Sequence, residues 1–184
     1  MTPLLLSLQN VSVRKYDSPV LHQLDWQVFA GQQWVIVGGN GAGKTTLLET
    51  LAGRWATSQG KLRKEGVVEL VAADYSFHRI VKSAAQYYQQ RFQSFEAAVA
   101  PSVREVLTNQ LKPVGTVRAD LLTLPPPPCS EEELLRITDL VGLSHLLDQP
   151  FVTLSNGETR RMLLARSLVK KPDILLLDYP FVGL

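Results

Sequence analysis

The stretch Trp34-Val35-Ile36-Val37-Gly38-Gly39-Asn40-Gly41-Ala42-Gly43-Lys44-Thr45 decides the fold of this 184-residue chain. It begins with four consecutive apolar residues, which are typical of a strand buried on both faces. The last eight residues fit the phosphate-binding pattern G-x-x-x-x-G-K-[ST], and the helix-forming residues Lys44 to Leu51 follow. A strand before the glycines and a helix after them are the context that this motif requires. The stretch therefore predicts an α/β fold with a phosphate-binding turn.

Each part of the motif has a physical role in binding a triphosphate. Glycines let successive backbone N–H groups turn inward, where a Cβ would obstruct the phosphates. A helix that begins near Gly43 points the positive end of its dipole at them. Lys44 would reach the β- and γ-oxygens, and the Thr45 hydroxyl would bind Mg²⁺. The residues predicted here to bind nucleotide are Gly38, Asn40, Gly41, Ala42, Gly43, Lys44, Thr45 and Thr46.

A second candidate site residue ends another apolar run. The residues Ile174-Leu175-Leu176-Leu177-Asp178 predict a buried parallel strand with a carboxylate at its carboxyl end. Open α/β sheets bind their ligands at that edge. Asp178 is therefore predicted to hold Mg²⁺, directly or through water, opposite Thr45. The pattern alone is common, and its pairing with the glycine-rich motif is what favours a metal role.

A third motif resembles a known family. Leu154-Ser155-Asn156-Gly157-Glu158 is similar to the L-S-G-G-Q signature of ATP-binding cassette (ABC) ATPases, and the spacing from there to Asp178 matches the family. The resemblance covers essentially the whole chain. It implies binding of ATP and Mg²⁺, and hydrolysis in which Lys44 and Asp178 take part. It also assigns four residues to the ATP of a partner domain: Ser155, Asn156, Gly157 and Glu158.

The resemblance implies an α/β fold of the P-loop NTPase class, with a mainly parallel sheet, an N-terminal antiparallel β subdomain and a helical subdomain insertion. The chain would be a single incomplete ABC domain over residues 1–184, because it ends where the family's D-loop begins. Its core would span about 1–75 and 155–184, and its helical subdomain about 76–154. Ser102 and Ser130 have the spacing of helix caps, and Ser155 with Glu158 has the spacing of a capping box. Strands are also predicted at 4–13, 20–29 and 67–72, and a helix at about 157–169.

Several positions depart from the family's pattern. Tyr179 stands where the family has the glutamate that polarises the attacking water. A neutral phenol with a pKa of ~10 does not accept a proton at pH 7, so the chain's own site is expected to hydrolyse ATP slowly. No glutamine follows the strand at 67–72, and Ser76 is a candidate metal ligand at that position. Tyr16 lies where the family stacks an aromatic ring on adenine.

Composition limits the partners. The net charge of +2 is too small to indicate a polyanion, so no nucleic acid is expected. One cysteine excludes an internal disulfide, and no apolar run is long enough to span a bilayer. The resemblance implies a second ABC domain as partner, in the same chain or in another copy, and a membrane permease. The resemblance also implies a cytoplasmic location, at the inner face of a membrane. Within the family, the chain most resembles tandem soluble ABC ATPases of the molybdate-transport type.

Two other functions compete with this interpretation. A non-catalytic, nucleotide-dependent interaction module would explain Tyr179 and the missing end of the domain. A small-molecule kinase with a P-loop would explain Lys44 and Asp178 but leaves the signature motif unexplained. ABC ATPases of DNA repair carry the same motifs with long coiled coils, and the middle of this chain has no sustained heptads.

Overall fold

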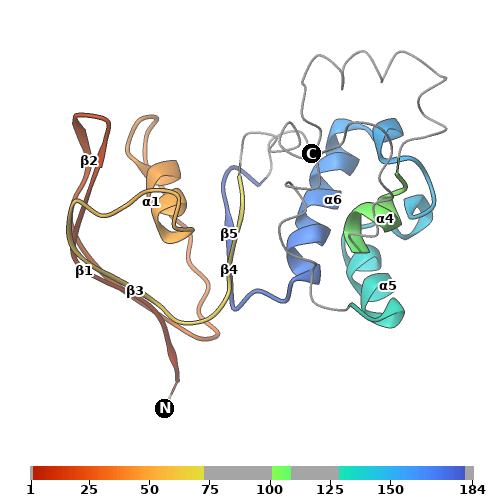
Figure 1. Cartoon of the computed structure of the whole chain (residues 1–184), viewed down its shortest axis with the longest axis horizontal. Helices are drawn as coiled ribbons and strands as arrows, with labels where there is room; N and C mark the ends of the chain where they lie inside the picture. Colours follow the sequence, from red (N-terminus) through yellow and green to blue (C-terminus); the bar gives the residue numbers. More distant parts are fainter. Residues whose placement is uncertain (1, 73–100, 109–128, 181–184) are drawn as a thin grey trace. The chain divides into compact units, whose positions relative to one another are not determined.

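The computed structural model describes residues 2–72, 101–108 and 129–180 (Figure 1). The chain divides into two compact units. The first consists of residues 1–71 and 172–178, and the second of residues 72–171 and 179–184. Among the described residues, no helix has the length and apolar character needed to cross a membrane.

The first unit contains an antiparallel sheet of three strands. Strand β1 (Leu4–Lys15) lies between β2 (Ser18–Phe29) and β3 (Gln59–Lys64). The strands β1 and β2 form a hairpin in which Lys15 is paired with Ser18 across a two-residue turn. The predicted strands at 4–13 and 20–29 are thus confirmed, with β1 extended to Lys15. The sheet contributes Leu6, Leu8, Val11, Val13, Leu21 and Val28 to the core of this unit.

The phosphate-binding motif leads into a helix in the same unit. Helix α1 covers Lys44–Leu51, as the sequence predicted. Strands β4 (Val68–Val71) and β5 (Ile174–Leu177) pair in parallel, with Val71 opposite Leu177. Parallel pairing places the carboxyl ends of both strands at one edge, where such sheets hold ligands. Residues 172–178 therefore complete a unit whose other part ends at residue 71.

The strand predicted at Trp34 to Val37 is wrong. These residues form no strand, and Val35 and Val37 are 86% and 84% exposed. The Trp34 ring packs edge-on against Trp26 at 5.4 Å between centroids, and its Nε1–H donates to Gln32 Oε1. An apolar run becomes a buried strand only where a neighbouring strand pairs with its backbone. In the described part of the chain, β4 and β5 pair only with each other.

The second unit is helical in its described part. It contains the helices α4 (Val103–Thr108), α5 (Glu131–Leu140) and α6 (Asn156–Val169). Two 3-10 turns, Ser144–Leu146 and Phe151–Thr153, lie between α5 and α6. Helix α6 packs against both α4 and α5 (Figure 1). Its apolar residues share one core with theirs, so α6 belongs to this unit, whereas the sequence division at residue 155 placed it with the core. Members of this core include Val106, Leu107, Leu134, Ile137, Met162, Ala165 and Val169.

The predicted helix caps of this unit are confirmed. The Glu105 backbone N–H donates to Ser102 Oγ at 3.2 Å, and the Ser102 backbone N–H donates to the Glu105 carboxylate at 2.8 Å. Ser130 Oγ accepts from the backbone N–H of Glu133 at 3.2 Å. The Glu133 carboxylate pairs with Lys171 instead of returning to the cap. These local bonds determine where the two helices begin.

Helix α5 offers a direct test of this core, because adjacent leucines differ in burial. Leu134 is 1% exposed and Leu135 is 44% exposed. Leu134→Ala is expected to lower the free energy of unfolding by about 2–5 kcal/mol, since it removes buried contacts and leaves a cavity. Leu135→Ala should cost less than about 1 kcal/mol. Urea unfolding followed by circular dichroism measures both, and equal losses would contradict the helical core described here.

Candidate nucleotide-binding site

The glycine-rich turn and the first residue of α1 form the first part of the site. Lys44 Nζ donates to the carbonyl oxygens of Gly38 at 2.7 Å and Gly39 at 2.8 Å. The side chain therefore folds back over its own loop. Gly43 caps the helix with φ +87°, and an added Cβ would lie 2.9 Å from Leu21 of β2. Both the left-handed backbone and the close approach of β2 require glycine at this position.

The beginning of α1 is suited to an anion. The cap residue is Gly43, which has no side chain to bond the first-turn N–H groups, and such groups are a ready site for an anion. No acidic residue lies in this first turn. The positive end of the helix dipole and the Lys44 ammonium group therefore act on the same region. This is the electrostatic requirement for binding a polyphosphate.

The second part of the site joins α1 to the end of β5. The Thr45 hydroxyl donates to Asp178 Oδ1 at 3.3 Å, although the two residues are 133 positions apart in the sequence. Asp178 is 5% exposed, and its backbone N–H donates to the Val71 carbonyl at 2.9 Å. The parallel pairing of β4 with β5 thus fixes the carboxylate against the helix that carries the phosphate-binding loop. The predicted approach of Thr45 and Asp178 is what the structure contains.

The Thr45 and Asp178 oxygens fit the chemistry of magnesium. A buried carboxylate is costly without a compensating cation or donors, and a hydroxyl beside it supplies a second hard oxygen ligand. Within residues 2–72, 101–108 and 129–180, no group of three or more His, Cys, Asp or Glu side chains could hold a metal. Mg²⁺ needs no such cage, because it keeps several waters and takes substrate phosphates as ligands. The third metal candidate, Ser76, lies outside the described residues.

The signature motif forms the beginning of α6 in the second unit. Ser155 Oγ accepts from the Glu158 backbone N–H at 3.3 Å, and the Ser155 backbone N–H donates to Glu158 Oε2 at 2.6 Å. The predicted capping box is therefore present. Hydrogen bonds from the Ser155 hydroxyl and backbone hold the pKa of Glu158 below its ordinary value. Asn156 is exposed and Gly157 is half-buried beside it; the role of this motif toward a partner's nucleotide stays a prediction.

Tyr179, the residue in place of the usual glutamate, has an unusual backbone. It has φ +49°, and its carbonyl oxygen accepts from Arg160 Nη1 of α6 at 2.8 Å. A non-glycine residue in the left-handed region costs about 1–2 kcal/mol. This contact could not be predicted from the sequence, since no local motif relates Arg160 to Tyr179. The side chain of Tyr179 is a phenol, so residue 179 brings no carboxylate to this position.

Tyr16, the predicted adenine contact, lies in the turn between β1 and β2. Its side chain is 87% exposed and its backbone has φ +55°. The ring forms a T-shaped pair with Trp55, at 6.3 Å between centroids and 73° between the ring planes. Trp55 belongs to none of the sequence motifs, and only the folded chain brings the two rings together.

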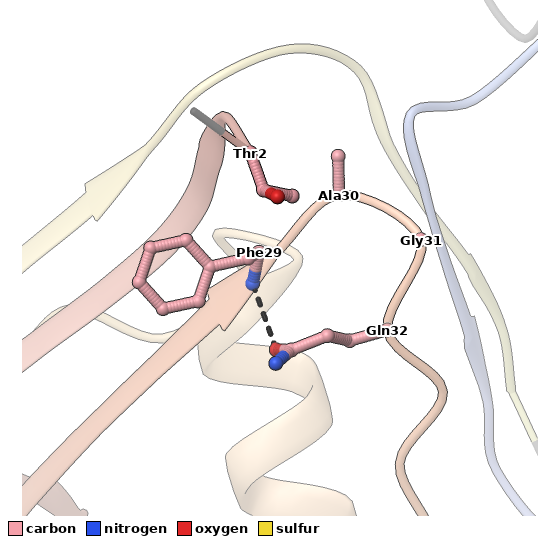
Figure 2. Close-up of a pocket in the computed structure, with 5 residues that line it drawn as sticks. All are labelled: Thr2, Phe29, Ala30, Gly31 and Gln32. Atoms are coloured by element: carbon pink, nitrogen blue, oxygen red, sulfur yellow. Dashed lines mark hydrogen bonds between the residues drawn. The ribbon is translucent and has the colours of Figure 1, made fainter.

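A hollow elsewhere in the first unit does not coincide with these residues. Figure 2 shows it at the end of β2, where the backbone N–H of Phe29 donates to Gln32 Oε1 at 2.9 Å. It has a volume of about 640 Å³ and is lined by Thr2, Phe29, Ala30, Gly31 and Gln32. Its lining contains no charged side chain and none of the predicted nucleotide-binding residues. It is therefore no candidate for the phosphate site.

Comparisons with known proteins agree on the family. A sequence model of the family described as ABC transporter matches residues 21–182. The zinc import ATP-binding protein ZnuC of Yersinia pestis bv. Antiqua (strain Antiqua) is 31% identical over 183 residues, covering 100% of this chain and 60% of its own length. An uncharacterized ABC transporter ATP-binding protein, YlmA of Bacillus subtilis (strain 168), is 28% identical over 185 residues, covering 98% of this chain and 65% of its own length.

Solved structures support the fold. The ADP conformation of an ATP-binding cassette of an ABC transporter has a TM-score of 0.68 at 20% identity, over 100% of this chain and 71% of that chain. A bacterial Atm1-family ABC exporter with ATP bound has a TM-score of 0.66 at 20% identity, over 100% of this chain and 30% of that chain. The predicted α/β fold is thereby confirmed. The chain spans about three fifths to two thirds of the length of the curated relatives it matches.

The capping box predicts a pH dependence of stability. The pKa of Glu158 is lower in the folded chain than its ordinary value of 4.5, so its contribution is present above pH 4.5 and is lost as the pH falls through the folded pKa. The stability advantage of the native chain over Glu158→Gln should therefore be largest near pH 7 and shrink below pH 4.5. Chemical unfolding at pH 7, 5 and 3.5, followed by circular dichroism, measures this difference.

Glu132, exposed in the first turn of α5, provides the matched control. Glu132→Gln should show a much weaker change with pH, because no cap bond depends on its charge. A difference between the native chain and Glu158→Gln that stays constant from pH 7 to pH 3.5 would contradict the role of the carboxylate in the box.

Proposed function

The chain belongs to the ABC transporter family, and we propose that it binds Mg-ATP at residues 38–46 and, in the complete protein, hydrolyses ATP to drive transport or another mechanical task. The observation that carries the proposal is the approach of the Thr45 hydroxyl to the buried Asp178 carboxylate at 3.3 Å. These two oxygens lie beside the beginning of α1, on which Lys44 provides the cation. Phosphate binding and metal binding thus share one helix end.

On binding, Lys44 would exchange neutral hydrogen-bond acceptors in its own loop for charged phosphate oxygens. Lys44 Nζ donates to two neutral carbonyl oxygens of its own loop. When the β- and γ-phosphates enter, the ammonium group would donate to anionic oxygens, so that both partners of each bond would carry a charge. The backbone N–H groups of the turn would hold the phosphates, and Thr45 and Asp178 would hold Mg²⁺. When bound, Mg²⁺ neutralises charge that develops on the transferred phosphoryl group.

Hydrolysis requires a base for the attacking water, and Tyr179 does not supply one. At pH 7 a neutral phenol does not accept a proton as an ionised carboxylate does. The loss of a positioned general base costs ~10²–10⁴ in rate. This chain's own site is therefore proposed to bind ATP and to hydrolyse it slowly. Its signature residues, from Ser155 to Glu158, would complete the site of a second ABC domain.

The partners follow from this arrangement. The second ABC domain would come from the same polypeptide or from another copy, and a permease would couple the pair to a membrane from its cytoplasmic side. Tyr16 is proposed to stack on the adenine, since its ring is the exposed aromatic group on the β1–β2 turn. The second candidate function, a non-catalytic nucleotide-dependent interaction module, is favoured specifically by Tyr179.

Lys44→Ala is expected to weaken Mg-ATP binding by at least about 100-fold, because it removes charged hydrogen bonds to the phosphates. Lys61→Ala is the matched control: Lys61 is an exposed lysine on β3, in the same unit, and outside the predicted site. A fluorescence titration of the full-length protein with ATP and magnesium measures both variants. Unchanged affinity in Lys44→Ala would refute the proposed site.

Tyr179→Glu is expected to raise steady-state phosphate release by about 10²–10⁴-fold at this site, since a carboxylate then stands beside Asp178. Tyr179→Phe separates this effect from a change of side-chain size, and should leave the slow turnover as it is. The measurement needs the complete protein with its partner domain. If Tyr179→Glu releases phosphate no faster than the native protein, the interaction-module function is favoured instead.

A further inference from the structure

The exposed position of Tyr16 has a structural cost. It is one of the two residues that connect β1 to β2, and its backbone lies in the left-handed region at φ +55°. Hairpin turns place Gly, Asn or Asp at such positions, because those residues tolerate positive φ. Here a large aromatic side chain occupies the position and remains 87% exposed. Because the strained backbone of Tyr16 is not compensated by burial of its ring, we interpret the ring as a group that contacts a ligand.

Trp55 is the ring that meets Tyr16, and it is held on several sides. Its Nε1–H donates to Glu49 Oε2 at 2.7 Å, and Lys15 Nζ lies 4.7 Å from its ring centroid. Lys15 Nζ also lies 3.9 Å from the same Glu49 oxygen. Lys15 lies over the indole ring, and the Trp55 and Tyr16 rings form a T-shaped pair at 6.3 Å between centroids. The arrangement fixes Trp55 and leaves the Tyr16 ring exposed.

This cluster is tied to the helix that carries the phosphate-binding residues. Glu49 lies on α1, five residues after Lys44, which corresponds to about 7.5 Å along the helix axis. Strand β2 connects the other side, because Val20 and Leu21 contact Gly43. Tyr16 is four residues before Val20, a span of at most about 14 Å. Tyr16 and the glycine-rich turn are therefore both connected to α1 and β2 by short stretches of chain.

We propose that Trp55 is a positioning residue that holds Tyr16 as the stacking platform for the base of the bound nucleotide. The T-shaped contact with Trp55 limits the orientations of the Tyr16 ring, and the Glu49 carboxylate and Lys15 ammonium fix Trp55 itself. The inference rests on the proposed function and deepens it. The phosphates would be held by the loop and the first turn of α1, whereas the base would stack on Tyr16, whose neighbour Trp55 is bonded through Glu49 to the same helix.

The test compares two ligands that share phosphates and differ in the base. Binding of Mg-ATP and of magnesium tripolyphosphate is measured for the full-length protein by calorimetry. Trp55→Ala should weaken ATP by about threefold to tenfold, as expected for a partly lost stacking contact, and should change tripolyphosphate by less than twofold. Trp55→Phe keeps an aromatic edge without the bond to Glu49, and is expected to fall between the native protein and Trp55→Ala.

A double-mutant cycle with Tyr16→Ala decides whether Trp55 acts through Tyr16. In that background, Trp55→Ala should have little further effect on ATP, since the platform is already absent. Additive losses would overturn the proposal, as would equal losses of ATP and tripolyphosphate in the single variant. The same experiment tests the proposed function separately, because a native protein that binds neither ligand refutes the phosphate site itself.

Discussion

The contact between the Thr45 hydroxyl and the Asp178 carboxylate is the constraint on which the site depends. It joins the first turn of α1 to the end of β5 across 133 positions of sequence. The contact exists because β5 pairs in parallel with β4, so that residue 178 emerges at the ligand-binding edge of the sheet. A different register of these two strands would move the carboxylate to the opposite face or away from the helix. The proposed metal site is in this sense a product of strand pairing.

In the described part of the chain, two of the five non-glycine residues with a left-handed backbone lie at the proposed site. Asp178 is a buried carboxylate, and Tyr179 directly after it has a left-handed backbone. Tyr16 is strained in the same way at the turn that carries the proposed base platform. Conformations of this kind persist where the surrounding structure over-determines them, and they cluster at functional sites. Arg160 provides such a determinant for Tyr179, because it binds that residue's carbonyl oxygen.

What could be predicted from the sequence was mostly local. The start of α1, the caps at Ser102 and Ser130 and the capping box of α6 follow from bonds within four residues, and all were found. The strand expected at Trp34 to Val37 failed, because an apolar run reports a preference for burial and says nothing of which strand pairs with it. The Trp55 cluster was missed for a related reason: its contacts join β1, α1 and the following turn, and no motif spans them.

Binding and hydrolysis place unequal demands on such a site. Binding draws on many contributors: backbone N–H groups of the turn, the helix end, Lys44 and the Thr45–Asp178 pair. Proton transfer from water depends on one side chain in one position, so a single substitution can remove it while the rest of the site still binds. The signature motif at the beginning of α6 is independent of both, since its capping box is formed by Ser155 and Glu158 without Tyr179. Under the proposed function, a cassette with a phenol at residue 179 would therefore lose turnover at its own nucleotide and still present the capped end of α6 to the nucleotide of a partner domain.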